Sequence, residues 1–192
     1  MSTAATAPNS LSVICPVRTL HGSAGLADEW LAVRTAVRAL LAAAEGAAPN
    51  GRDYYHQGDG AFKAVVKERG LVLSAIKALS DEIFWVAETI LDGPETAGPC
   101  LIDFAAAAGH APASPVMRPT IHLNGTSAEG LKRPCVVVFK AANAAEEALR
   151  SIIPNGRDYN PDVLDTARAQ HFARVEFVRK VGAYYLLIAM TK

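Results

Sequence analysis

The sequence predicts an all-α protein in which two consecutive antiparallel helical hairpins pack into a four-helix bundle. One observation is a repeat: the hexapeptide Pro-Asn-Gly-Arg-Asp-Tyr occurs at residues 49–54 and again at 154–159, 105 residues later. Another is that apolar residues spaced three and four apart flank both copies, as in helices packed nearly parallel to a partner. One hairpin is too small to bury its apolar face alone, so the repeat predicts tandem duplication with pseudo-twofold symmetry.

Composition limits the classes of function. The chain has 192 residues, 51% of them apolar, and carries 19 basic and 19 acidic residues. Zero net charge argues against long nucleic acid or an anionic membrane surface as a partner. No apolar run approaches the roughly 20 residues that cross a bilayer, and the first residues lack a basic signal region. Cys15, Cys100 and Cys135 are odd in number and widely separated, which predicts free thiols and a cytoplasmic location.

The first hairpin is predicted to span residues 18–91, after a flexible N-terminal arm at 1–17. Ser23 is the predicted N-cap of its first helix. That helix should end at the bend, because Pro49 lacks a backbone donor and Gly51 can take the left-handed conformation. The apolar positions of the first helix are Leu26, Trp30, Val33, Val37, Leu40, Ala44 and Ala47. Those of the second are Phe62, Val65, Arg69, Val72, Ile76, Leu79, Ile83, Val86 and Ile90, with Arg69 as the only polar member.

A linker rich in glycine and proline is predicted at 92–117, followed by the second hairpin at 118–192. Its first helix repeats the earlier spacing at Leu131, Cys135, Val138, Ala142, Ala145, Leu149 and Ile152. Pro134 is expected in the first turn or just before it, since an interior proline costs about 3 kcal/mol. Residues 136–139 have strand-like composition, and only the register of the repeat favours a helix there.

The last helix places basic residues at interior positions. Its periodic positions are Leu164, Ala167, His171, Arg174, Val178, Val181, Tyr185 and Ile188. His171 corresponds to Arg69 of the first copy at an offset of 102 residues. Two interpretations stand: the polar residue fixes helix register or oligomeric state, or it contacts a ligand inside the bundle.

The repeated bend also has two interpretations. As a turn, proline ends one helix, Asn-Gly reverses the chain and aspartate caps the next helix. That leaves the arginine and tyrosine of each copy without a role. A guanidinium binds phosphate or carboxylate and a phenol stacks on a base, so the bends also suit a nucleotide pocket. The same Arg and Asp would equally pair across a protein interface.

The candidate ligand-binding residues come from the bends, the interior basic positions and the segment before residue 128. That segment forms a turn and an N-cap in its simplest interpretation. The full set is Asn50, Arg52, Asp53, Tyr54, Tyr55, Arg69, His122, Asn124, Asn155, Arg157, Asp158, Tyr159 and His171. The sequence contains no nucleophile elbow, glycine-rich phosphate loop, paired-carboxylate motif or zinc signature, which predicts a protein that is not an enzyme and needs no cofactor or metal.

Two motifs resemble a known group of proteins. Residues 119–127 and the Asn-Gly-Arg-Asp-Tyr bends, followed in the first copy by Tyr55, Gln57-Gly58-Asp59 and Ala61-Phe62, resemble short helical-hairpin proteins of bacteriophages and prophages. Those proteins carry a Thr-Ile-His-Leu-Asn-Gly-Thr-Ser start and one Pro-Asn-Gly-Arg-Asp-Tyr-Tyr bend. This chain differs in having two copies, a first copy that keeps only His21-Gly22-Ser23 of the start, and Asn160 where tyrosine is usual.

The resemblance implies a function in a bacterial host cell. Small helical oligomers of phages include proteins that sequester the nucleotide second messengers of bacterial immunity. The leading hypothesis is therefore non-catalytic sequestration of a small nucleotide, such as a cyclic immune second messenger, at Arg52, Tyr54, Arg157 and Tyr159, by a self-associating protein. The alternative is a protein-interaction or assembly module that docks a partner or a second copy through the bends.

Overall fold

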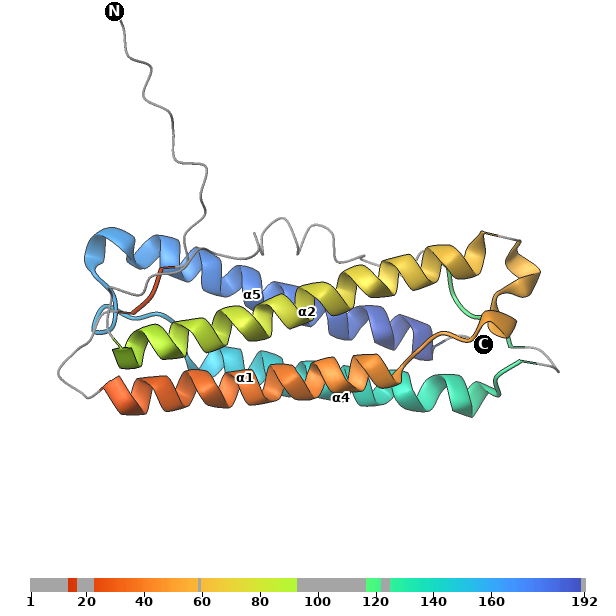
Figure 1. Cartoon of the computed structure of the whole chain (residues 1–192), viewed down its shortest axis with the longest axis horizontal. Helices are drawn as coiled ribbons and strands as arrows, with labels where there is room; N and C mark the ends of the chain where they lie inside the picture. The colour runs from red at the N-terminus through yellow and green to blue at the C-terminus, as the bar shows by residue number, and fades with distance from the viewer. Residues whose placement is uncertain (1–13, 17–22, 59, 93–116, 122–124, 191–192) are drawn as a thin grey trace, which may run out of the picture.

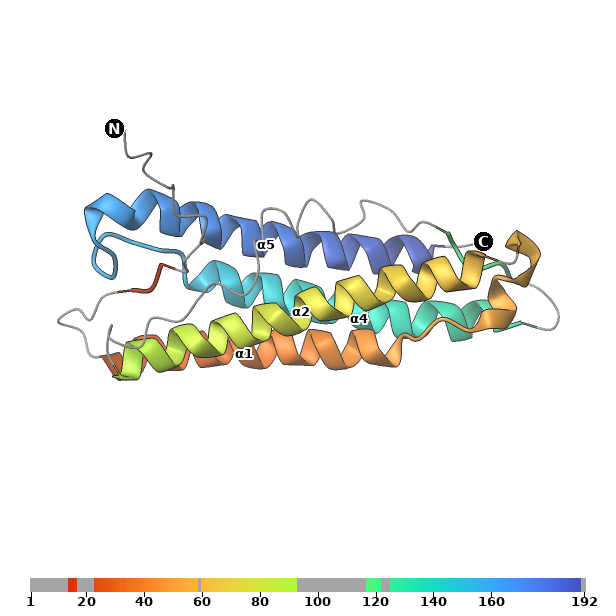
Figure 2. The same cartoon turned by 45° about the horizontal axis from the view of Figure 1, so that its top comes forward.

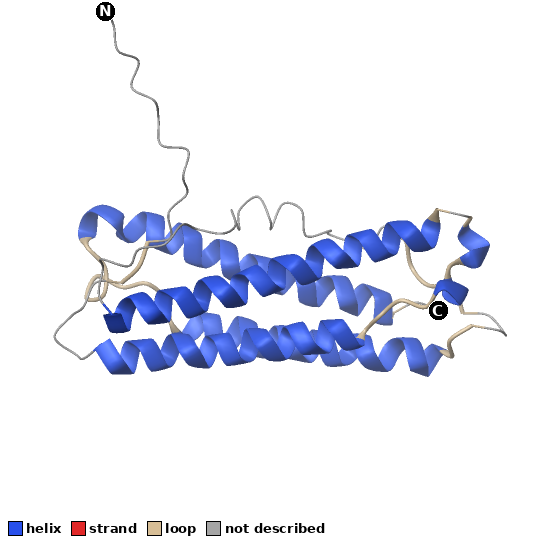
Figure 3. Cartoon of the chain, in the orientation of Figure 1, coloured by secondary structure: helices blue, strands red, loops and turns tan. Residues whose placement is uncertain are grey.

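The structure, a computed structural model, describes residues 14–16, 23–58, 60–92, 117–121 and 125–190. These residues form four long helices and two short 3-10 helices, and they contain no strand (Figure 3). The elements in chain order are α1 (Ser23–Gly46), η1 (Gly51–Asp53), η2 (Tyr55–Gln57), α2 (Ala61–Asp92), α4 (Ala128–Ser151) and α5 (Pro161–Ala189). The all-α prediction is confirmed, and residues 136–139 are helical despite their strand-like composition. Most of the predicted arm and linker lies outside the described residues.

The four helices lie side by side along one long axis (Figure 1). α1 packs against α2 and α4, α4 packs against α5, and α2 approaches α5 at only a few points. The bend between α1 and α2 lies at one end of the bundle, and the bend between α4 and α5 lies at the other, as both views show (Figures 1 and 2). The two copies of the hexapeptide are therefore separated by the length of the helices.

One continuous core joins all four helices. In α1 the predicted positions from Trp30 to Ala44 are buried, whereas Leu26 and Ala47 are only half-buried and Ala27 is buried instead. α2 buries a wider face than predicted, because Glu68, Glu82 and Thr89 turn inward beside the apolar positions. Among the described residues no helix is both long and apolar enough to cross a membrane.

The position of Pro134 differs from the prediction. Ser127 caps α4 by accepting a hydrogen bond from the Gly130 backbone nitrogen at 3.1 Å, so the helix begins early and Pro134 lies inside it. A proline has no N–H to donate to the carbonyl four residues back. The carbonyl of Gly130 therefore lacks its normal helical partner, at the end of the bundle that also holds the first bend.

Cys15 and Cys135 are free thiols, as predicted. Burial raises the pKa of each to about 11, and in Cys15 a hydrogen bond with Thr89 partly opposes that rise. Because the thiolate is the nucleophile and metal ligand, neither cysteine is activated at neutral pH. Cys100 lies outside the described residues.

Gly182 marks the closest approach of α4 and α5. A Cβ at this position would lie 3.1 Å from Cβ of Ala142 and 3.6 Å from Cδ2 of Phe139. Gly182→Val is expected to destabilise the protein by about 1–2 kcal/mol, since overpacking forces the two helices apart. Urea denaturation measures this as a lower midpoint with an unchanged slope. Gly70→Val is the control, because a Cβ at Gly70 meets nothing within 4 Å; an equal loss in both variants would contradict the packing explanation.

Candidate functional site

The two bends share a hydrogen bond from the arginine backbone nitrogen to the asparagine side chain. The side-chain oxygen of Asn50 accepts from the Arg52 backbone nitrogen at 3.1 Å, and that of Asn155 accepts from Arg157 at 2.9 Å. Such asparagine turns explain the repeated Asn-Gly pair. The predicted left-handed conformation of Gly51 is wrong, since the chain turns there through the right-handed 3-10 helix η1; among the described residues only Gly58 has a positive φ, of 98°.

Asp53 anchors a distant segment and does not cap α2, which corrects the sequence-based expectation. Its side chain is fully buried, and Oδ1 accepts from the backbone nitrogen of Thr126 at 2.7 Å. Its backbone oxygen also accepts from the Thr120 nitrogen at 2.8 Å. Asp158 is only half-buried, and its Oδ2 accepts from Nδ2 of Asn155 at 2.6 Å. The same residue type thus has different contacts in the two bends.

The repeated tyrosines are core residues. Tyr54 is 3% exposed and Tyr159 is 6% exposed, and burial raises the pKa of both hydroxyls. Neither ring is open to a base arriving from solvent. The exposed aromatic side chain of the first bend is Tyr55, which is 58% exposed and lies with its ring centroid 3.6 Å from that of His56. The second bend has Asn160 at the position of Tyr55.

The arginines of the bends are exposed but far apart. The bends that carry Arg52 and Arg157 lie at opposite ends of the bundle, so the two arginines do not belong to one surface (Figure 2). At the first bend, Nε2 of Gln57 donates to the carbonyl of Arg118 at 2.5 Å and to Oγ1 of Thr120 at 2.9 Å. This places the exposed Arg118, which sequence analysis missed, at the same end as Arg52. His122 and Asn124 lie outside the described residues.

The two interior basic residues differ in their hydrogen bonds. Nη2 of Arg69 donates to the carbonyls of Ala44 at 3.1 Å and Glu45 at 2.7 Å, which satisfies the C-terminal end of α1. His171 is fully buried, and neither of its ring nitrogens has a hydrogen-bond partner among the described residues. Burial lowers the pKa of His171 to about 4, with further contributions from Arg174 and Arg150, so the ring is neutral at pH 7.

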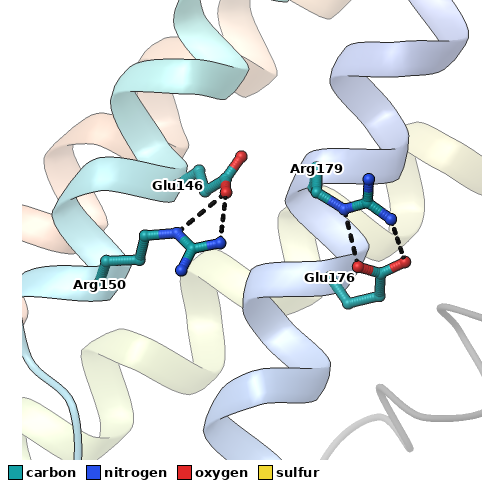
Figure 4. Close-up of polar contacts among 4 residues, drawn as sticks. All are labelled: Glu146, Arg150, Glu176 and Arg179. Atoms are coloured by element: carbon teal, nitrogen blue, oxygen red, sulfur yellow. Dashed lines mark hydrogen bonds and ion pairs between the residues drawn. The ribbon is translucent and has the colours of Figure 1, made fainter.

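Arg174 forms a buried ion pair between α5 and α2. Its Nη2 and Nε lie 2.5 Å and 2.6 Å from Oε1 of Glu82 on α2, and both side chains are almost fully buried. The pairs Arg150–Glu146 and Arg179–Glu176 lie on the helix surface, within α4 and α5 respectively (Figure 4). Exposed pairs of that kind contribute only a few tenths of a kcal/mol.

A cavity of about 80 Å³ lies beneath the first bend. It is lined by the bend, the first turns of α4 and the last turns of α5, together with Val65 and Arg69 of α2. Three buried polar atoms of its lining residues lack a hydrogen-bond partner in the described part of the chain: Oδ2 of Asp53, Nε of Arg69 and the hydroxyl of Tyr185. Burial raises the pKa of Tyr185 to about 12, and the nearby Arg69 partly opposes that rise.

Comparison of the chain with protein-family models, curated proteins and solved structures finds no match. Within the described ranges, no three His, Cys, Asp or Glu side chains are placed to hold a metal ion.

Proposed function

We propose that the protein binds a small nucleotide without transforming it, and that the site is the outer surface of the first bend. The observation that carries this proposal is the exposed side chain of Tyr55, whose ring lies against His56. Tyr55 follows the exposed Arg52 by three residues. An aromatic ring stacks on a base of any sequence, and a guanidinium forks onto a phosphate. Arg118, held at the same end by Gln57, adds a second guanidinium for phosphate.

The bend suits such a site because it is held in place from beneath. Buried Asp53 ties the bend to Thr126, and Gln57 ties it to Thr120, across more than 60 residues of sequence in each case. A site with few conformations to lose binds more tightly than a mobile one. In the second copy Asn160 stands at the position of Tyr55, three residues after Arg157. We therefore propose one nucleotide site in each chain, although the hexapeptide occurs twice.

The nucleotide class follows from the resemblance to phage hairpin proteins. It points to a cyclic second messenger of bacterial immunity as the ligand and to the cytoplasm of the bacterial host as the location.

We further propose that the two hairpins derive from one ancestral hairpin by duplication, which gives the bundle a pseudo-twofold axis. The buried positions support it, because residues 105 apart in α1 and α4 are buried alike. The pairs are Trp30 and Cys135, Val33 and Val138, Val37 and Ala142, Leu40 and Ala145, and Ala44 and Leu149. A Cβ at Gly51 would meet Phe62, and one at Gly156 would meet Leu164, which occupies the equivalent position in α5.

Calorimetry with a panel of cyclic and linear nucleotides tests the proposed ligand. Protein at about 100 times a micromolar dissociation constant is expected to give saturable heat with at least one cyclic nucleotide. Arg52→Ala should weaken binding about 10- to 100-fold, the loss of a charge-assisted hydrogen bond, and Tyr55→Ala should weaken it comparably through lost stacking. Arg157→Ala is the matched control, from the identical hexapeptide at the other end, and should bind normally. Absence of heat with every nucleotide, or an equal loss in Arg52→Ala and Arg157→Ala, would contradict the proposal.

The rival function, docking of a protein partner or second copy, is favoured by a different observation. Phe62 and Val66 lie one helical turn apart on α2 and are 38% and 46% exposed. Asp53 itself is buried and therefore not available to pair across an interface. Sedimentation equilibrium of the Phe62→Ser, Val66→Ser double variant distinguishes the docking function from nucleotide binding. Docking is favoured if the parent protein is an oligomer that binds no nucleotide and the double variant is a monomer.

A further inference from the structure

The cavity beneath the first bend is distinct from the outer surface of Tyr55 and Arg52. Two of the side chains whose atoms lack a hydrogen-bond partner among the described residues are more than nine-tenths buried: Asp53 is fully buried and Tyr185 is 2% exposed. Buried polar groups are normally hydrogen-bonded, and leaving one unpaired costs about 1–3 kcal/mol. Several such atoms around one space indicate that the space receives a polar occupant.

The lining presents donors and acceptors together. Nε of Arg69 is a donor, and the hydroxyl of Tyr185 can also donate. Oδ2 of Asp53 is an acceptor. Gly130 is also a lining residue, and its carbonyl, which Pro134 leaves without a helical N–H, supplies a second acceptor. An occupant that satisfies all four groups must itself offer two acceptor lone pairs and two donor hydrogens.

The charges that line the cavity and its volume further limit the chemical class of the occupant. Arg69, with its guanidinium, and Asp53, with its carboxyl group, both line this space. One of the two groups would repel an anion and the other a cation, so a charged occupant is disfavoured. A volume of about 80 Å³ corresponds to two or three times the roughly 30 Å³ that a water molecule occupies in the liquid. A nucleotide needs a pocket of several hundred Å³ and does not fit. The apolar part of the wall, from Val65, Leu131 and Ile188, suits one small alkyl group.

We propose that this cavity is a second binding site, specific for a small neutral carboxamide. The carbonyl oxygen of a primary amide accepts from Arg69 and Tyr185, and its NH₂ group donates to Asp53 and to the Gly130 carbonyl. Acetamide, with four heavy atoms, has the required size and places its methyl group against the apolar wall. The site is independent of the nucleotide proposal, since it uses neither Arg52 nor Tyr55.

Titration of the ¹⁵N-labelled full-length chain with acetamide, followed by amide chemical shifts, tests the site. Saturable shifts are expected for Thr126 and for residues around Tyr185, with millimolar affinity. Acetate and methylammonium, which have the same number of heavy atoms or fewer but carry a charge, are expected to give no saturable shift at these positions. Tyr185→Phe removes one donor with little change of shape and should weaken acetamide binding about 2- to 10-fold.

Tyr159→Phe is the control, because Tyr159 is a buried tyrosine at the opposite end of the bundle. It should bind acetamide like the parent protein. Three results would overturn the proposal: no saturable shift, because ordered water alone fills the cavity; equal shifts with acetamide, acetate and methylammonium; or the same affinity in Tyr185→Phe as in the parent.

Discussion

Replacing Glu82 by leucine is expected to lower the free energy of unfolding by about 3–5 kcal/mol, which is a third or more of the stability of a typical domain. The physical reason is the burial of both partners: Arg174 is 4% exposed and Glu82 is 2% exposed, with 2.5 Å between Nη2 and Oε1. Without its carboxylate, the guanidinium remains as an uncompensated charge in the core. The replacement itself is apolar and of similar size, so lost packing contributes little.

The double variant Glu82→Leu, Arg174→Met separates the charge effect from packing. When both ions are replaced by apolar residues of similar volume, stability is expected to return to within about 1 kcal/mol of the parent or above it. Urea denaturation measures all variants, and the control Glu176→Ala, which breaks the exposed pair with Arg179, should leave the unfolding midpoint nearly unchanged. A double variant as unstable as Glu82→Leu would show that the pair does not act through burial of charge.

Acidification from pH 6.5 to pH 4 is expected to destabilise the protein by up to about 3 kcal/mol through His171 alone. Burial, Arg174 and Arg150 lower the pKa of His171 from 6.5 to about 4. Below pH 6.5 the unfolded chain therefore takes up a proton that the folded chain does not accept until about pH 4. Each unit of pKa difference corresponds to 1.36 kcal/mol. The contribution is absent above pH 6.5 and reaches its full size near pH 4.

His171→Leu should flatten the pH dependence of stability in this interval and leave stability at pH 7 unchanged or higher. Both ring nitrogens of His171 lack partners among the described residues, so an apolar replacement breaks no hydrogen bond seen there. Thermal unfolding at half-unit pH steps measures the effect, and His56→Leu, at an exposed histidine of the first bend, is the control. An identical slope in His171→Leu and the parent would refute the assignment to His171.

The candidate site shows how far local spacing predicts a binding surface. The bends were predictable because an asparagine turn is made by residues two positions apart, and both copies form it. The roles of Asp53, Tyr54 and Tyr159 were not, since their partners and burial depend on elements distant in sequence. Tyr55, which was among the predicted residues, is the exposed aromatic one. Arg118 was missed, although it directly precedes the start motif of the second copy.

The sequence by itself determined the features set by contacts within a few residues: four helices, the periodic faces that they bury, and two turns with the same asparagine hydrogen bond. Spacings of three and four residues specify these directly. The tertiary structure alone decided that the bends lie at opposite ends, that Asp53 holds Thr126, and that Arg69 satisfies the end of α1. Those contacts join residues 24 to 73 positions apart. Only the packing of the helices, which the periodicity leaves open among several arrangements, brings such residues together.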